Sequence, residues 1–280
     1  MKKQQYEVVA DSACNQKGLI YFRRYCIKKH DVASEDAKSF RAVSAIMVKI
    51  KICGLFRDED IDYANEAAPD YIGFVFAPKS RRRVSPGAAA AFREKLRDGI
   101  VPVGVFVNAA VDEIAALYRD GVIAAAQLHG GEKDEYVSRL RERCGAPLIR
   151  AVRSEDLEDT ARSAVPDSPS ALSRFSVAAG CLLIDNGDGG TGQSFDWRRL
   201  DVLRNPACRD GEAHPPRDPV PFFLAGGIGL HNIDAALACR PYAVDVSSGA
   251  ETDGVKDREK MLRLVEKVRG SPAPRRAGKG

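Results

Sequence analysis

The feature that most constrains the fold is a regular alternation of short apolar runs with amphipathic stretches from residue 47 onward. Most of these runs are continuously apolar, which is typical of strands in a parallel sheet covered on both faces. Parallel strands need a crossover between them, so the pattern predicts repeated strand–helix units. The eight runs span residues 48–53, 71–76, 101–107, 124–129, 147–152, 181–185, 221–227 and 242–249.

The intervals between the runs carry helix signals. Ser85 and Pro86 suit the N-cap and the first position of a helix. Residues 111–121 place Ile114, Leu117 and Tyr118 on one face before a closing Gly121. Further helices are predicted within 134–144, 154–164, 231–240 and 258–270, and the last of these has an apolar face made of Met261, Leu264, Val265 and Val268.

Eight such units within residues 47–270 predict an α/β fold, a (β/α)₈ TIM barrel, for which ~250 residues is typical. A doubly wound sheet is the competing arrangement. Residues 1–46 form an N-terminal extension of unknown role. A start codon assigned too far upstream would explain it, because Met47 directly precedes the first strand. The proline-rich stretch 205–219 is expected to be a surface insertion, and residues 271–280 a disordered tail.

Composition excludes several classes of function. The net charge of +4 comes from the ends of the chain, because residues 1–46 carry nine basic and five acidic residues and residues 271–280 carry three basic ones. The remainder is weakly acidic, which argues against nucleic-acid binding. No apolar run is long enough for a membrane span or a signal peptide. The seven cysteines have no paired spacing and the four histidines are scattered, so we expect reduced thiols, no metal site and a cytoplasmic protein.

The carboxyl ends of the strands form the reactive face of such barrels. Cys53 ends the first run, His129 the fourth and Asp185 the sixth. The loops after the last strands commonly bind phosphate through backbone N–H groups. The residues expected to hold a phosphate are Gly190 and Gly192 after the sixth strand, Gly226 and Gly227 after the seventh, and Ser248 and Gly249 at a helix N-terminus after the eighth.

Seven motifs, in order, give the chain a close resemblance to the phosphoribosylanthranilate isomerases of tryptophan biosynthesis. They are "KICG", "GFVFAPKSRRRVSP", "VGVFVN", "QLHG", "LIDNGDGGTGQSFDW", "LAGGI" and "AVDVSSGAE", and the resemblance covers about residues 47–270. "AGGI" alone would be shared by many phosphate-binding barrels, whereas the whole set is specific.

The resemblance implies an Amadori rearrangement of N-(5′-phosphoribosyl)anthranilate to 1-(2-carboxyphenylamino)-1-deoxyribulose 5-phosphate, with no cofactor. It implies that Cys53 is the general base, that Asp185 is the general acid and that Arg82 binds the anthranilate carboxylate. Because Arg81 and Arg83 flank Arg82, the choice among these three arginines stays open. The substrate is a small phosphosugar, and the protein is expected to be a monomer or homodimer. Catalysis requires a thiolate favoured by nearby positive charge, and a carboxyl group kept protonated by desolvation or a nearby anion.

Three other functions compete with this interpretation. The isomerase of the histidine pathway acts on a related aminoaldose and is expected to use aspartates on strands 1 and 5. In this chain strand 1 offers Cys53 and strand 5 ends in Ala151-Val152-Arg153, which argues against that function. Indole-glycerol-phosphate synthase would need a lysine and glutamates at strand ends. A phosphate-binding module without catalysis would not need both Cys53 and Asp185. Gln127 shares the strand face of His129 because side chains alternate, and both are secondary candidates.

Overall fold

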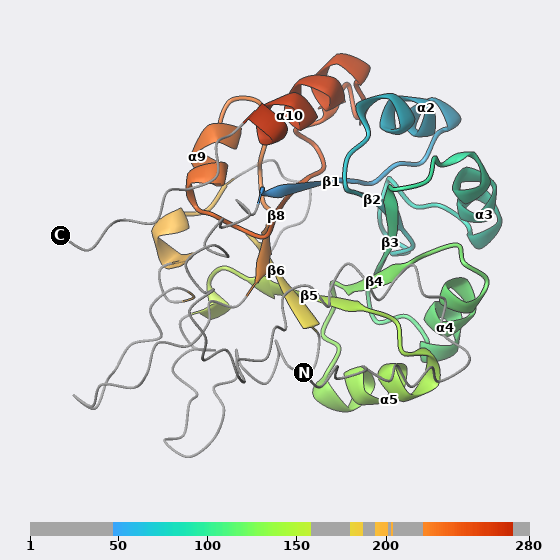
Figure 1. Ribbon diagram of the computed structural model, residues 1–280. Coiled ribbons are helices and arrows are strands. Elements are labelled where there is room, and N and C mark those ends of the chain that lie inside the picture. The colour runs from blue at the N-terminus through green and yellow to red at the C-terminus, as the bar shows by residue number, and fades with distance from the viewer. Residues whose placement is uncertain (1–46, 158–179, 187–193, 201–202, 204–220, 271–280) are drawn as a thin grey trace, which may run out of the picture.

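The computed structural model describes residues 47–157, 180–186, 194–200, 203 and 221–270. Eight parallel strands form a closed barrel, in which β8 returns to pair with β1 (Figure 1). The predicted TIM barrel is confirmed and the doubly wound sheet is wrong, because an open sheet would leave two unpaired edges. The strands are β1 (Lys49–Cys53), β2 (Tyr71–Val75), β3 (Val101–Phe106), β4 (Ala125–Leu128), β5 (Leu148–Arg153), β6 (Gly180–Asp185), β7 (Phe222–Leu224) and β8 (Ala243–Val246).

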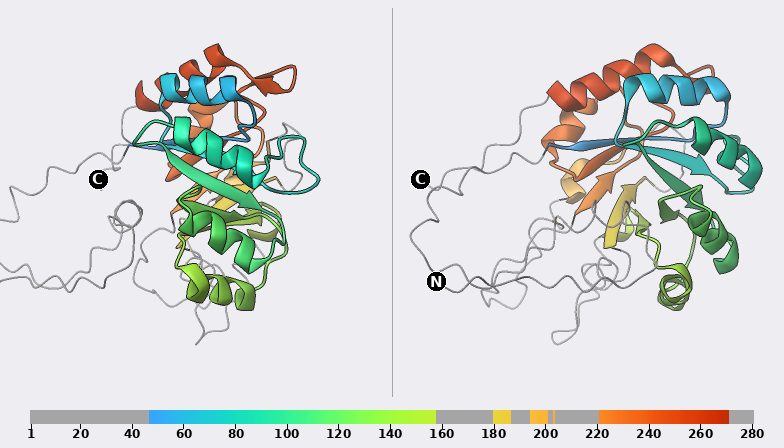
Figure 2. Two further views of the ribbon diagram at one scale, coloured as in Figure 1. Left: turned by 90° about the vertical axis from the view of Figure 1, so that its right-hand side faces the viewer. Right: turned by 45° about the vertical axis from the view of Figure 1, so that its right-hand side comes forward.

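The described helices lie outside the ring of strands, in an arc from α9 and α10 through α2 and α3 to α4 and α5 (Figures 1 and 2). They cover the outer face of the barrel and leave the strand ends free at its two openings. The helices are α2 (Asp58–Ala67), α3 (Pro86–Lys95), α4 (Val111–Arg119), α5 (Asp134–Cys144), α9 (Ile233–Ala238) and α10 (Arg258–Gly270), together with the 3₁₀ helix η2 (Trp197–Leu200).

Local chemistry explains where these helices begin and which faces they bury. The hydroxyl oxygen of Ser85 accepts the N–H of Ala88 at 3.1 Å, so Ser85 caps α3 as predicted. The predicted apolar face of α10 is confirmed, since Met261, Leu264, Val265 and Val268 are all buried. Burial of each such side chain contributes about 1.5–3 kcal/mol relative to exposure. Phe195 and Trp197 pack against the core beside η2.

The barrel interior is layered from apolar to polar. At its amino-terminal end Tyr71, Phe223 and Tyr242 fill the lumen, with the hydroxyl oxygens of the two tyrosines 2.7 Å apart. Above them lie Lys51 and Asp245, which are directly paired in the register of β1 and β8. The interior is therefore closed at one end and carries its charge near the other.

The connection after β8 differs from the prediction. A turn at residues 247–250 leads into an antiparallel hairpin, so Ser248 and Gly249 do not lie at a helix N-terminus. The next helix, α10, starts at Arg258. The hairpin consists of β9 (Glu251–Thr252) and β10 (Val255–Lys256), two strands too short to give a periodic signal.

Several predicted segments lie outside the described residues. These are the extension 1–46, residues 158–164 of the helix expected after β5, the insertion 205–219 and the tail 271–280. Among the helices of the described ranges, none has the length and apolar character needed to cross a membrane.

Candidate active site

The candidate site lies at the carboxyl ends of the barrel strands. Cys53 is the last residue of β1 and Asp185 the last of β6, while His129 directly follows β4. Cys53 and Asp185 are 8% and 9% exposed. The parallel arrangement therefore brings a thiol, an imidazole and a carboxyl group to one opening of the barrel.

A buried ion pair lies beneath these groups. The ammonium group of Lys51 donates to Oδ1 and Oδ2 of Asp245 at 3.1 and 3.0 Å, and to Oε1 of Gln127 at 3.0 Å. Burial lowers the pKa of Lys51, but the charges and hydrogen bonds of Asp245 and Cys53 together outweigh burial and leave this pKa above its ordinary value. The barrel interior therefore holds a positive charge below the opening.

The polar chain continues from Lys51 to Asp185. The amide nitrogen of Gln127 lies 2.9 Å from Nδ1 of His129. On the other side of the ring, Nε2 of His129 lies 3.5 Å from Oδ2 of Asp185. Oδ1 of Asp185 accepts the backbone N–H of Asn186 at 2.6 Å. These contacts connect side chains from β8, β1, β4 and β6 across the barrel.

Burial governs the protonation of Cys53. Desolvation raises the pKa of its thiol above the ordinary value, and the negative charge of Asp245 adds to this. The positive charges of Lys51 and Lys256 lower the pKa but only in part, and Lys51 also hydrogen-bonds the sulfur. The positive charge required near the base is present, yet the unliganded site keeps the proton on sulfur.

The pKa of Asp185 is shifted in the opposite direction to that of Cys53. Burial raises the pKa of its carboxyl group, but the hydrogen bond and charge of His129, the N–H of Asn186 and the charge of Lys51 outweigh burial. The pKa of Asp185 therefore lies below its ordinary value. These shifts favour a thiol at Cys53 and a carboxylate at Asp185, the reverse of the states expected for a base and an acid.

Arg82 lies beside this site but is already paired with a carboxylate. Its Nε and Nη2 donate to the two oxygens of Glu251 at 2.6 and 2.9 Å, and its side chain is 8% exposed. Glu251 also accepts from Arg81 at 2.6 Å and from Lys256 at 2.7 Å. One buried carboxylate is thus surrounded by three cations, which leaves excess positive charge.

The loops after β6, β7 and β8 meet at close backbone distances. Gly226 has φ +84°, and a Cβ there would lie 3.0 Å from Oδ1 of Asp185. A Cβ on Gly249 would collide with the carbonyl oxygen of Ile228 and lie 2.7 Å from Cα of Gly229. The side chain of Asn232 fixes the loop after β7, because it accepts the N–H of Gly229 and donates to the carbonyl oxygen of Gly227. Small residues are required here for the loops to touch.

Of the residues predicted to bind phosphate, Gly226, Gly227, Ser248 and Gly249 lie in these touching loops. Gly190 and Gly192 lie outside the described residues. Within the described ranges, no group of three or more metal-ligating side chains is gathered closely enough to hold a metal ion.

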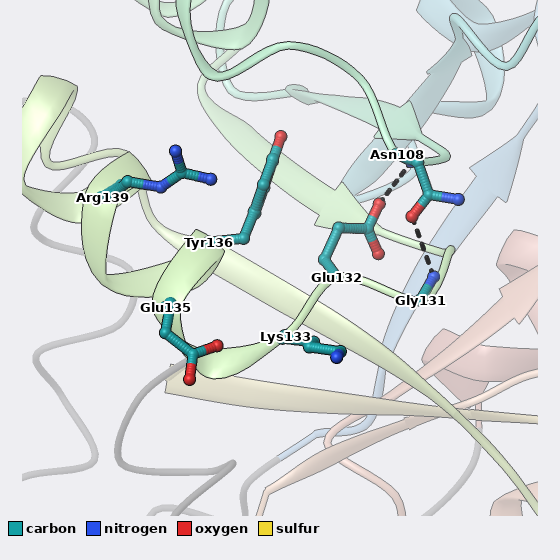
Figure 3. A pocket seen from close by; sticks show the side chains of 7 residues that line it. All are labelled: Asn108, Gly131, Glu132, Lys133, Glu135, Tyr136 and Arg139. Atoms are coloured by element: carbon teal, nitrogen blue, oxygen red, sulfur yellow. Dashed lines mark hydrogen bonds between the residues drawn. The ribbon is translucent and has the colours of Figure 1, made fainter.

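A separate hollow of about 350 Å³ lies at the rim, between the loop after β3 and the start of α5 (Figure 3). Glu132 is its one buried carboxylate, and both its oxygens are already used by the N–H groups of Asn108 and Gly130 at 2.7 and 2.9 Å. The hydroxyl of Tyr136 donates to the carbonyl of Ala109 at 2.8 Å. This hollow contains neither Cys53 nor Asp185 and is not the reaction site.

Comparison with known proteins identifies the family. The family model for N-(5′-phosphoribosyl)anthranilate (PRA) isomerase matches residues 50–267. The chain belongs to the PRA isomerase family. It is therefore an isomerase of tryptophan biosynthesis, which converts N-(5′-phosphoribosyl)anthranilate to 1-(2-carboxyphenylamino)-1-deoxyribulose 5-phosphate.

Individual PRA isomerases match over nearly their whole length. That of Endomicrobium trichonymphae is 41% identical over 228 residues, which are 80% of this chain and 99% of the relative. That of Caldanaerobacter subterraneus is 39% identical over 229 residues, again 80% of this chain and 99% of the relative. The crystal structure from Thermotoga maritima is 31% identical with a TM-score of 0.63 and covers 80% of this chain and all of that one.

A PRA isomerase in complex with reduced 1-(o-carboxyphenylamino)-1-deoxyribulose 5-phosphate is 30% identical to this chain, with a TM-score of 0.62. It covers 80% of this chain and all of that one. The resemblance seen in the sequence motifs is thus confirmed at the level of the family and the fold.

Sequence reasoning missed Lys51, Asp245, Glu251 and Lys256. A signal for the first two was present, since each is a charged residue inside an otherwise apolar run, in "VKIKIC" and "YAVDV". Charged side chains are almost never fully buried unless they are paired, so two opposite charges in buried strands indicate a pair. No comparable signal marks Glu251 and Lys256, which follow the eighth strand.

Proposed function

We propose that Cys53 and Asp185 are the general base and the general acid of the rearrangement. The observation that carries this proposal is their common position at the barrel opening, where the charge of Lys51 acts on both. Acid–base catalysis uses pairs of titratable groups whose pKa values are shifted in opposite directions, as those of Cys53 and Asp185 are.

The chemistry follows from these two groups. Asp185 protonates the ribose ring oxygen while the bond from that oxygen to C1′ breaks, which gives the open-chain Schiff base. The thiolate of Cys53 then removes the proton on C2′, and the electron pair moves toward nitrogen to form the enolamine. Protonation at C1′ and loss of the C2′ hydroxyl proton complete the ketone. Electrons are only rearranged, so no redox cofactor is required.

One proton has to change places before this sequence starts. The unliganded pair holds it on Cys53, and catalysis requires it on Asp185. The substrate brings a phosphate and a carboxylate to the opening, and these negative charges raise the pKa of a nearby carboxyl group. We infer that substrate binding favours the protonated form of Asp185, while Lys51 and Lys256 stabilise the thiolate.

Arg82 is our candidate for binding the anthranilate carboxylate. Glu251 accepts hydrogen bonds from Nε and Nη2 of Arg82. The Nη1 group, on another edge of the guanidinium, is left to bind a second carboxylate. Arg81 also contacts Glu251 but is more exposed, which favours Arg82. Gly226, Gly227, Ser248 and Gly249, with Gly190 and Gly192, are the proposed phosphate-binding residues.

Residues 47–270 are proposed as the complete catalytic unit, acting as a monomer or homodimer on a free phosphosugar in the cytoplasm. A related enzyme from Thermotoga maritima is described as dimeric. In the described ranges Cys53, Cys144 and Cys181 are free thiols, which suits a reducing compartment.

The test is to measure turnover after Cys53→Ala and Asp185→Asn, using the loss of anthranilate fluorescence as substrate is consumed. Each variant should lose a factor of about 10²–10⁴ in kcat, the usual contribution of a positioned acid or base. Cys181→Ala is the matched control, because Cys181 is also a buried strand cysteine but lies in the apolar layer at the other end. Near-normal turnover of either site variant would reject its assigned role.

A further inference from the structure

We propose that Gln127 is a positioning residue that holds His129 in the tautomer with its proton on Nε2, directed at the carboxylate of Asp185. The proposal rests on the assignment of Asp185 as the acid. It adds a positioning role for Gln127, which acts on Asp185 only through His129, and it makes the ion pair beneath Gln127 the group that orients its amide.

The argument begins at Lys51, whose ammonium group has three N–H donors and no acceptor. Lys51 is fully buried, and Asp245 holds its nitrogen in place through both carboxylate oxygens. Any group that faces this nitrogen within hydrogen-bond distance must therefore present an acceptor atom, and the acceptor of an amide side chain is its oxygen. Gln127 does so with Oε1 at 3.0 Å.

This contact settles which way the amide of Gln127 points. With Oε1 directed at Lys51, the NH₂ group is directed at His129, and Nε2 lies 2.9 Å from Nδ1 of the ring. Because an amide NH₂ can only donate, Nδ1 must accept and cannot carry a proton. In the neutral imidazole the proton is then on Nε2.

The other side of the ring faces the proposed acid. Nε2 lies 3.5 Å from Oδ2 of Asp185, so a proton on Nε2 is on the side of the ring that faces this carboxylate. The backbone N–H of Asn186 occupies Oδ1 at 2.6 Å. Each carboxylate oxygen thus has its own donor, and both donors stabilise the anion that remains after Asp185 has released its proton.

The opposite tautomer would create two repulsive contacts at once. A proton on Nδ1 would face the NH₂ of Gln127, and the lone pair of Nε2 would face the oxygen of Asp185. Rotating the amide would not relieve this, because the NH₂ group would then face the ammonium of Lys51. Gln127 is 1% exposed, so water does not replace these contacts.

The direct test is NMR of the full chain with ¹⁵N-labelled histidine rings, recorded near neutral pH. The His129 signal is assigned by its loss in His129→Gln. His231→Gln is the control, because it should remove a different one of the four histidine signals. We expect an unprotonated Nδ1 and a protonated Nε2 for His129. A proton on Nδ1 in the wild-type protein would overturn the proposal.

Gln127→Met tests whether Gln127 is the cause. Methionine is of similar length but cannot donate to Nδ1, so the ¹⁵N shifts should move toward an average of the two tautomers. We expect kcat to fall on the order of tenfold, less than for loss of the acid itself, with KM changed less than about twofold. Unchanged ring shifts, or unchanged turnover with altered shifts, would overturn the proposed role.

Failure of this proposal and of the acid assignment can be told apart. Near-normal turnover of Asp185→Asn would reject the acid role whatever tautomer His129 adopts. The wild-type ring shifts, once assigned with His129→Gln, need neither Gln127→Met nor activity, so they test the positioning role even if Gln127→Met is unstable. Conversely, a wrong tautomer would leave the roles of Cys53 and Asp185 intact.

Discussion

At the scale of single residues, Lys51 and Asp245 connect the fold to the chemistry. Burying such a pair carries a desolvation penalty that an apolar pair of similar volume would avoid. Here the ammonium also interacts with Cys53 and Gln127 and lowers the pKa of Asp185. Lys51 therefore provides the positive charge that a thiolate base requires, and Asp245 holds it in a position where water cannot screen it.

The protonation of Cys53 gives a pH prediction. Its pKa is raised, so the thiol form persists as the pH rises through the range in which a free thiol would ionise, and the thiolate appears only above it. The measurement is the ultraviolet thiolate absorbance of the wild-type protein minus that of Cys53→Ser, followed across pH without substrate. Subtraction removes the tyrosines and the other cysteines. Ionisation below the range of a free thiol would show that Lys51 and Lys256 dominate over burial.

At the scale of elements, the site depends on how the loops after β6, β7 and β8 meet. Gly226 lies against Asp185, and Gly249 pairs with Gly229 in an isolated bridge. The hairpin β9–β10 then brings Glu251 to Arg82. Each contact joins a residue at one strand end to a loop from another, so the loops that are proposed to bind phosphate also position the acid and the arginine.

Gly249→Ala should disrupt this junction. Its new methyl group would collide with the carbonyl oxygen of Ile228, a backbone atom that cannot rotate away. We expect a loss of about 1–3 kcal/mol in the free energy of unfolding, as for overpacking, together with a higher KM. The measurements are denaturant unfolding and steady-state kinetics.

Gly87→Ala is the control for that substitution. Gly87 lies in the first turn of α3, and a Cβ there meets nothing within 4 Å. Alanine in a helix is favoured over glycine, so this variant should be unchanged or more stable by up to about 1 kcal/mol. Equal behaviour of the two variants would mean that the loops after β7 and β8 move apart without cost.

At the scale of the whole molecule, the described barrel extends from β1 to α10, and its closure requires only residues 49–270. β1 is central to this, since it pairs with both β2 and β8 and carries Lys51 and Cys53. Every residue to which we assign catalysis or carboxylate binding lies between these limits.

The domain proposal can be tested by expressing residues 47–280 alone. Because the barrel and its site lie within this part, we expect kcat and KM within about twofold of the full chain. Mass spectrometry of the natural amino terminus would show separately whether residues 1–46 are translated. A large loss of activity on truncation, with the barrel still folded, would assign residues 1–46 a part in the reaction.

The order and type of the elements, and the residues that end the strands, can be predicted from the amino-acid sequence alone. The reason is that helix and strand periodicities, caps and turn residues act over a few positions, as at Ser85 and in α10. Those local signals, with the family motifs, were enough to place Cys53, Asp185 and Arg82 at one end of the barrel. They did not show the hairpin after β8, whose strands have two residues each.

Only the tertiary structure decided the partners of these residues. Lys51 reaches Gln127 across 76 positions of sequence and Asp245 across 194, and no local pattern specifies such contacts. The same holds for Arg82 and Glu251, which are 169 positions apart. Protonation follows from these contacts, because burial and the sum of nearby charges set a pKa and both depend on barrel closure. The sequence can therefore place the proposed reactive residues at one end of the barrel, whereas the directions of their pKa shifts follow from the closed barrel.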